Sequence, residues 1–168
     1  VDDTSGPQVP WENNKTELAA WAKTGAKYLI LARCGVTDAG QWTMTVTLYD
    51  LQSASAVLSK YYRGALTGLR RGAHLYADVV VRQLTGKPGV AHTRIAFAND
   101  STGHKEIYLA DYDGRNVIQL TRDKSIALLP RWSPDGKRLY YTTYRYQNPD
   151  TFEINLTERK IKPVSLYQ

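Results

Sequence analysis

Two side chains on one predicted helix, His74 and Asp78, could form an acid–base pair because they stand four residues apart. Residues at this spacing share a helix face and can hydrogen-bond to each other. An imidazole held by a carboxylate can move a proton near neutral pH. No nucleophile, metal partner or phosphate-binding loop accompanies the pair, so we interpret it as a structural hydrogen bond between helix and sheet.

The other residues with chemical potential are scattered along the chain. The three histidines, His74, His92 and His104, do not form a metal-binding pattern. Cys34 is the only cysteine, which excludes an internal disulfide, and we expect it to be a small core residue. The sequence has no Gly-x-Ser-x-Gly motif, cysteine pair or phosphate loop. We therefore predict no catalytic residue, no metal site and no cofactor.

The clearest local motif is the turn Ser133-Pro134-Asp135-Gly136. Proline presets the backbone for the first central position, aspartate can bond its own backbone, and glycine accepts a positive φ. Trp132 precedes this turn, and a run rich in tyrosine and threonine follows it. The pattern predicts a strand, a tight turn and a second strand.

Charge and hydropathy exclude two classes of partner. The formal charge is +6, but residues 1–90 carry 10 basic and 7 acidic groups and residues 91–168 carry 12 and 9. Nucleic-acid binding requires a clustered basic face, and only Arg70-Arg71 form a local cluster. No run of about 18 apolar residues could insert into a membrane.

The first half of the chain predicts an α/β domain over residues 14–89, preceded by a loose arm over residues 1–13. Asn14 is the expected N-cap of a short helix whose apolar face includes Leu18, Trp21 and Ala22. Residues 28–32 predict a buried strand, residues 42–49 a half-buried alternating strand, and residues 56–62 a third strand. A stripe on the following helix comprises Leu69, Ala73, Tyr76, Val80 and Leu84. We expect a two-layer arrangement in which the helices cover one face of the sheet.

The second half has a different pattern, with short strands and turns at a spacing of about ten residues. The predicted strands are 93–98, 106–112, 116–121, 139–144, 151–155 and 160–166. The domain boundary is expected near residues 89–91. A shift of 44 residues places Thr93–Phe97 on Lys137–Tyr141 and Arg115–Thr121 on Arg159–Ser165. Repeats of 40 to 50 residues with four short strands are typical of propeller blades, so the whole chain is predicted to be α+β, with antiparallel blades in residues 90–168.

Two signatures resemble the TolB family of the Tol–Pal system. The first starts at Leu69-Arg70-Arg71-Gly72-Ala73-His74, includes Asp78, and continues through Leu84-Thr85-Gly86 and Gly89 into Thr93–Phe97. The second joins Asp111, Asp113-Gly114, Asn116 and Gln119-Leu120-Thr121 to Pro130, Trp132 and the Ser-Pro-Asp-Gly turn. The resemblance extends from about Trp21 to the end of the sequence.

This resemblance implies a small α/β domain followed by a six-bladed propeller, in a non-enzymatic periplasmic protein. It implies binding to the lipoprotein Pal and to Tol proteins, with a role in outer-membrane integrity and cell division. The family's Pal contacts include the segment before Ser-Pro-Asp-Gly, which is Ala127, Leu128 and Leu129 in this sequence. We expect a fragment or a shortened relative with about 1.7 blades, an incomplete propeller whose open edges could pair between copies.

Two other functions are compatible with blades. A propeller can gate the active site of a serine peptidase of the α/β-hydrolase type, but that reading requires a nucleophile elbow that the sequence does not contain. A ligand-binding propeller could use exposed rings, with Tyr140, Tyr141, Tyr144 and Tyr146 as candidates. Alternation in that strand would place half of these rings in the core.

Overall fold

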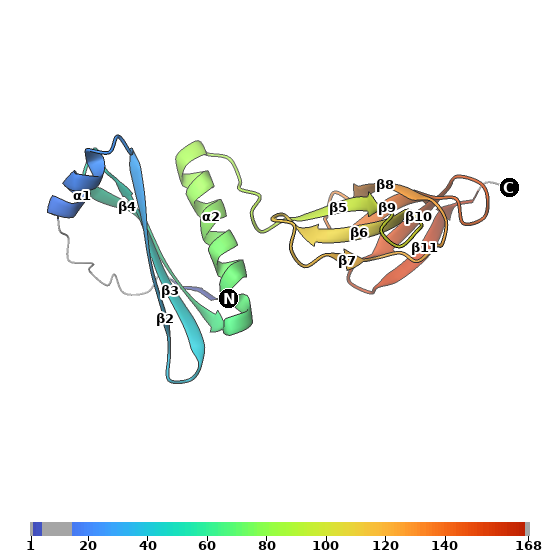
Figure 1. Cartoon of the computed structure of the whole chain (residues 1–168), viewed down its shortest axis with the longest axis horizontal. Coiled ribbons are helices and arrows are strands. Elements are labelled where there is room, and N and C mark those ends of the chain that lie inside the picture. The colour runs from blue at the N-terminus through green and yellow to red at the C-terminus, as the bar shows by residue number, and fades with distance from the viewer. Residues whose placement is uncertain (1, 5–14, 167–168) are drawn as a thin grey trace. The chain divides into compact units, whose positions relative to one another are not determined.

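The computed structural model describes residues 2–4 and 15–166, and the chain divides into two compact units, Val1–His92 and Thr93–Gln168 (Figure 1). The proposed N-cap Asn14 and most of the predicted loose arm lie outside the described residues. Within that arm, however, Asp2–Thr4 form strand β1, which pairs with β4. The backbone groups along the edge of β4 give this short segment hydrogen-bonding partners that its own sequence does not reveal.

The first unit is built on an antiparallel sheet with the strand order β1-β4-β3-β2. Its further elements are α1 (Lys15–Ala22), β2 (Tyr28–Val36), β3 (Gln41–Asp50), β4 (Ser55–Ala65), the 3-10 turn η1 (Leu66–Gly68) and α2 (Leu69–Thr85).

The predicted alternation of β3 is confirmed, because Trp42, Met44, Val46 and Leu48 are all buried. These side chains form one cluster with residues of β4 and α2, including Tyr76 and Val80. Tyr76 and Val80 also confirm the centre of the predicted helix stripe. Leu69, Ala73 and Leu84 from the same stripe are exposed, because the helix contacts the sheet along a narrower line than the pattern predicts.

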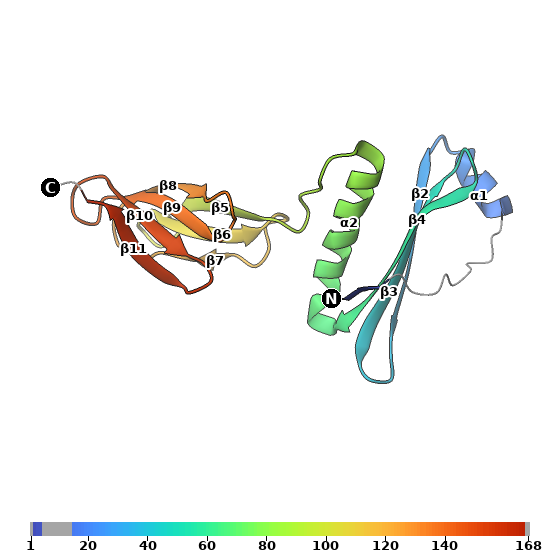
Figure 2. The ribbon, with the colours of Figure 1, turned by 180° about the vertical axis from the view of Figure 1, so that it is seen from behind.

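The expectation that both helices cover one sheet face is wrong, since α1 and α2 lie on opposite faces (Figure 1). Leu18 of α1 packs against Tyr49 and Leu29, whereas α2 packs against the residues of β3 that alternate with Tyr49. Figure 2 shows the same arrangement from behind. Trp21, predicted to face the core, is exposed because α1 is short and only its Leu18 side reaches the sheet.

Strand β2 was expected to be buried, but most of its residues are exposed. Among the described residues it forms the edge of the sheet and pairs only with β3, so its apolar run is not covered on both faces. Cys34 lies in this strand and is exposed, which corrects its assignment to the core. A continuous apolar run therefore predicts a strand here but does not predict its depth.

The second unit consists of two antiparallel sheets, whose order is β5-β6-β7 in the first and β11-β10-β9-β8 in the second. The strands are β5 (Arg94–Asn99), β6 (Glu106–Asp111), β7 (Ile118–Gln119), β8 (Ala127–Trp132), β9 (Arg138–Thr143), β10 (Asp150–Asn155) and β11 (Lys160–Ser165). Their core includes Ile107 of β6, Ala127 of β8, Leu139 of β9 and Ile154 of β10, so it is shared by both sheets.

The 44-residue repeat corresponds to repeated strands in this unit. It places β5 on the bounds of β9 and β6 on those of β10, and it places the two residues of β7 within β11. Strand β8 has no counterpart in the first sheet within the described part of the chain. The antiparallel pairing of short strands predicted for this half is confirmed.

Candidate functional site

The segment before the Ser-Pro-Asp-Gly turn forms a bulge in β8. Leu128 pairs with Thr142 and Arg131 pairs with Tyr140, so Leu129 and Pro130 together face a single residue of β9. Proline is suited to a bulge because it has no N–H to donate to the ladder. Leu129 has a φ of +56°, a left-handed conformation that is unfavourable for a branched side chain.

The three residues predicted to contact a partner differ in their exposure to solvent. Ala127 is 0% exposed within the core, so we withdraw it from the candidate surface. Leu128 is half-buried, and Leu129 is 66% exposed. The neighbouring Ile126, which the sequence reasoning missed, is also exposed. We call Ile126, Leu128 and Leu129 the β8 surface.

Hydrogen bonds hold the beginning of β8 in place. The Ala127 amide donates to the Lys105 carbonyl at 2.8 Å, and the Tyr144 amide donates to the Ile126 carbonyl at 3.0 Å. A hollow of about 340 Å³ adjoins this segment, and the residues that line it are Ala98, Asn99, Asp100, Lys105 and Leu128. The β8 surface is thus an exposed aliphatic patch on a well-supported backbone, an arrangement suited to protein binding.

Leu129→Asn is expected to raise the free energy of unfolding of the second unit by about 1 kcal/mol. Asparagine accepts the left-handed backbone more readily than leucine does, and the exposed leucine side chain contributes little packing. Native-state hydrogen exchange of β9 amides would measure the change. Val164→Asn is the matched control, because Val164 is an exposed aliphatic residue of β11 without a positive φ. Equal effects of both substitutions would contradict the assignment of strain to Leu129.

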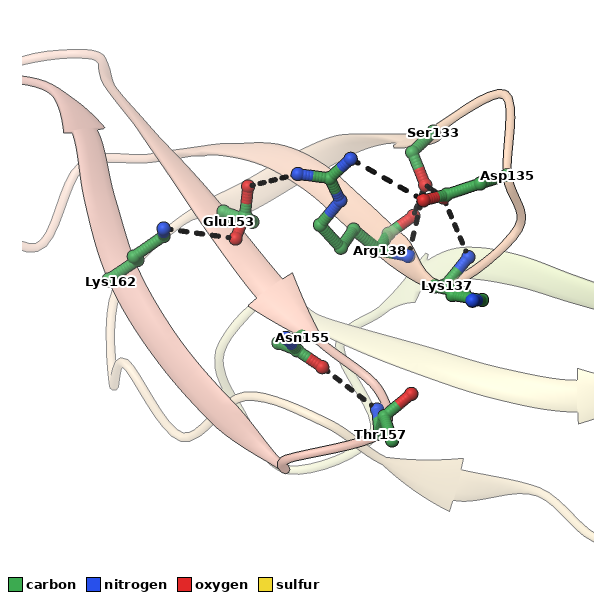
Figure 3. Close-up of polar contacts among 8 residues, drawn as sticks. All are labelled: Ser133, Asp135, Lys137, Arg138, Glu153, Asn155, Thr157 and Lys162. Atoms are coloured by element: carbon green, nitrogen blue, oxygen red, sulfur yellow. Dashed lines mark hydrogen bonds and ion pairs between the residues drawn. The ribbon is translucent and has the colours of Figure 1, made fainter.

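The Ser-Pro-Asp-Gly motif forms a turn held by its own side chains (Figure 3). The Ser133 hydroxyl donates to Asp135 Oδ1 at 2.5 Å and accepts from the Arg138 amide at 3.0 Å. The Lys137 amide also donates to Asp135 Oδ1, at 3.0 Å, and Gly136 has a φ of +66°. The Ser133 hydroxyl, followed by the Lys137 amide, lowers the pKa of Asp135 below its ordinary value. The side chains of Ser133 and Asp135 thus both stabilise the turn, which supports a structural role for the motif.

On the strands next to the turn, Glu153 of β10 lies between two cations, Arg138 of β9 and Lys162 of β11 (Figure 3). Its carboxylate is 3.6 Å from Arg138 Nη1 and 3.4 Å from Lys162 Nζ. A buried carboxylate requires such partners, because burial alone would penalise its charge. The group therefore ties β9, β10 and β11 together.

Asp78 holds the loop after α2 against the helix. Its Oδ1 accepts from the Ala91 amide at 2.7 Å, and its Oδ2 accepts from the His92 amide at 3.1 Å and contacts His92 Nδ1. A Cβ on Gly89 would lie 2.5 Å from the Asp78 Cα, so this close approach requires glycine. A hydrogen bond between His74 and Asp78 stays a prediction. The helical spacing of His74 and Asp78 gave no indication of His92, because a partner 14 residues away leaves no periodic signal in the sequence.

The stability of the first unit is expected to fall in acid as Asp78 becomes protonated. Burial acts to raise the pKa of Asp78, but hydrogen bonds from His92 and the Ala91 and His92 amides outweigh it and lower the pKa below 3.8. The carboxylate thus stabilises the fold above about pH 4, and this contribution is lost as the pH falls through the folded-state pKa. Urea unfolding between pH 7 and pH 2 would measure it. The exposed Asp38 provides the control: Asp38→Asn should keep this pH dependence, whereas Asp78→Asn should reduce it.

The four tyrosines proposed for a ligand-binding surface differ in their burial. Tyr141 is buried, and its hydroxyl donates to Asp123 at 3.1 Å. Burial, followed by the charge of Asp123, raises the pKa of Tyr141 above its ordinary value. Tyr144 and Tyr146 are exposed, while Tyr140 is half-buried. The alternation expected from the sequence therefore removes Tyr141 from any surface.

Within residues 2–4 and 15–166, no three His, Cys, Asp or Glu side chains are placed to hold a metal ion. In the same part of the chain, neither α1 nor α2 is long and apolar enough to span a membrane.

Comparisons with known proteins identify relatives of this chain. The family model of the TolB beta propeller domain matches residues 81–168. Tol-Pal system protein TolB of Desulfosudis oleivorans is 40% identical over 141 residues, covering 83% of this chain and 32% of the relative. Protein TolB homolog of Chlorobium luteolum is 38% identical over 128 residues, covering 76% of this chain and 29% of the relative. The chain therefore spans about a third of the length of the curated relatives it matches.

A solved structure is similar in fold. The crystal structure of TolB from Acinetobacter baumannii superposes with a TM-score of 0.80 at 23% sequence identity. The superposition covers 90% of this chain and 39% of the other one. The relatives described here bear TolB names and not the names of peptidases, so they do not support a propeller that gates a serine peptidase.

Proposed function

The chain belongs to the TolB family, and from this premise we propose that it acts in the Tol–Pal system as a binding protein without a catalytic activity of its own. Relatives that cover most of this chain are named Tol-Pal system proteins. We also propose that Val1–His92 corresponds to the small α/β domain that precedes the propeller in this family. The location we propose is the periplasm, where such a protein would help to maintain the outer membrane during cell division.

The absence of a catalytic role is supported by how the charged side chains are used. Asp78 is bonded to two backbone amides and a histidine, Asp135 stabilises a turn, and Glu153 contacts two cations. A general acid or base needs a polar atom directed at a substrate. These three carboxylates are directed at the protein's own backbone and cations, as expected for a binding module.

The proposed partners are a Pal-type lipoprotein and Tol proteins, with Pal bound through the β8 surface. One observation supports this location above the others: Leu129 keeps an exposed leucine in a strained left-handed conformation. Strain that the fold does not need is often retained where function requires it. Self-association through edge strand β5 is a further proposal, which light scattering of the purified chain would test by detecting dimers.

Titration of the chain with the soluble domain of a Pal-type lipoprotein tests the proposed function. Calorimetry should show saturable binding in the micromolar range, as expected of a small interface with few anchor residues. Binding should persist in high salt, because the β8 surface is aliphatic. Absence of binding at concentrations near 100-fold above that range would contradict the proposal.

A further inference from the structure

A groove in the second unit combines aliphatic walls with three arginines. It has a volume of about 520 Å³ and lies between β7 and the hairpin of β10 and β11. The residues that define its character are Arg94, Arg122, Arg159, Ile118, Leu156 and Ile161. We call it the arginine groove. Its volume is within the range of small-molecule binding sites.

The three arginines of the groove come from separate elements and lack acidic partners. Arg94 begins β5, Arg122 follows β7, and Arg159 lies in the turn before β11. Among the residues that the structure describes, none of these guanidinium groups forms an ion pair, and no acidic residue lines the groove. By contrast, Arg138 and Arg145 in the same unit are both paired with carboxylates.

Three guanidinium groups around one hollow repel one another unless an anion joins them. Each offers a planar array of donors that matches the oxygens of a carboxylate or phosphate. Arg94 has an aromatic neighbour, since its Cζ lies 6.0 Å from the centre of the Trp132 ring. Because none of the three arginines is paired with a carboxylate among the described residues, the groove offers three cations to one anion.

Arg159 has a left-handed backbone conformation, which is unfavourable for arginine. It lies two residues before Ile161 and has a φ of +55°. Counted back from the strand residues Ile118 and Ile161, which is one residue off the 44-residue shift, the counterpart of Arg159 is Asn116, with a φ of +52°. Asparagine is well suited to this conformation, and arginine is not. The turn thus retains an unfavourable residue that places a positive charge at the groove.

The walls of the groove are suited to an aliphatic group. Ile118 is 51% exposed and Ile161 38% exposed, although both belong to strands of a packed unit. Leu120 and Leu156 extend the same lining and are half-buried. Covering these side chains with an aliphatic body would be favourable, since apolar surface would leave water.

We propose that the arginine groove binds a small amphiphile, an aliphatic body that carries one phosphate or carboxylate group. The anionic group lies among Arg94, Arg122 and Arg159, and the aliphatic body covers Ile118 and Ile161. This site is separate from the β8 surface in its residues and in its chemistry. Its test is therefore independent of binding to Pal.

Titration of the full chain with four probes tests this site, with the amide signals of Ile118 and Ile161 followed by NMR. The probes are octyl phosphate and octanoate below their micellar concentrations, inorganic phosphate, and octyl glucoside as a neutral amphiphile. At least one of the octyl anions should bind saturably, and the better one identifies the anionic group. Inorganic phosphate and octyl glucoside should each bind at least about tenfold more weakly, because each lacks one half of the recognised chemistry.

Arginine variants connect that binding to the groove. Arg159→Asn and Arg122→Gln should each weaken the octyl anion about tenfold, the loss expected for one charged hydrogen bond. Arg159→Asn should remain folded, since asparagine occupies the repeated position as Asn116. Arg115→Gln is the matched control, because Arg115 is exposed in the same unit and does not line the groove. The proposal is overturned if neither octyl anion binds, if octyl glucoside binds equally well, or if Arg115→Gln weakens binding as much.

Discussion

Glu106→Ala is expected to lower the free energy of unfolding of the second unit by about 3–5 kcal/mol. Glu106 is 2% exposed and accepts three hydrogen bonds. The donors are the Thr121 hydroxyl at 2.5 Å, the Asp123 amide at 3.0 Å and the Lys124 amide at 2.8 Å. Each donor left without a partner costs about 1–3 kcal/mol when it is buried, and the lost side chain adds a cavity.

Hydrogen exchange of the β9 and β10 amides is the measurement for Glu106, because it reports on the second unit separately from the first. Glu158→Ala is the matched control. Glu158 lies in the same unit and is exposed, and its carboxylate is 3.5 Å from Nζ of the exposed Lys160 side chain. Its removal should change the stability by less than about 0.5 kcal/mol. Similar effects at both positions would show that the Glu106 hydrogen bonds do not support the fold.

Gly72→Val is expected to destabilise the first unit by about 3 kcal/mol. Trp42 is 1% exposed, and a Cβ at position 72 would lie 2.5 Å from its Cη2 atom. The Trp42 ring cannot shift toward β4 to make room, because Gly64 of β4 is also close: a Cβ there would be 3.3 Å from Trp42 Nε1. The indole therefore lies in a slot between β4 and α2 that only glycine leaves open, and added atoms force the helix away from the sheet.

The neighbouring Ala73 supplies the control for Gly72. It is exposed on the same helix, so Ala73→Val imposes the helix penalty of valine without the contact with Trp42. Its expected cost is about 0.5 kcal/mol. Hydrogen exchange of β3 amides measures both variants. A small effect of Gly72→Val would mean that α2 can move without loss and does not depend on the Trp42 slot.

The sequence predicted those elements whose pattern follows from local geometry. The alternation of β3 predicted the burial of Trp42 and Leu48, because a half-covered strand buries every second residue. Strands β5, β6, β9, β10 and β11 were predicted within one residue of their observed bounds, since turn residues such as Gly114 and Gly136 mark their ends. The predicted strand 116–121 is shorter in the structure, where β7 has two residues, and β8 was not among the predicted ranges.

Features that depend on neighbouring elements could not be predicted from the sequence. Cys34 is exposed because β2 is an edge strand. The position of a strand within a sheet cannot be predicted from the residues of that strand alone. Helical spacing pointed to His74 as a partner of Asp78, which stays a prediction, and gave no sign of His92, which comes from a loop after the helix. For the same reason, spacing alone could not identify His92 as a contact.

The candidate site was predicted in part. The segment ahead of the turn was identified from the resemblance to the TolB family, but its three residues have different environments. Only the backbone reveals that Leu129 lies in a bulge with a positive φ, because leucine itself gives no signal for that conformation. The arginine groove joins residues from three elements, so no local pattern marks it.

The most direct measurement of the central claim is a side-by-side titration of wild type, Leu129→Asn and Val164→Asn with the soluble domain of a Pal-type lipoprotein. Val164 is 55% exposed on β11, at the opposite edge of the sheet from β8. The β8 surface predicts equal Kd values for wild type and Val164→Asn, and a Kd at least about tenfold higher for Leu129→Asn. The same Kd for all three proteins, or no binding by the wild type, would contradict it.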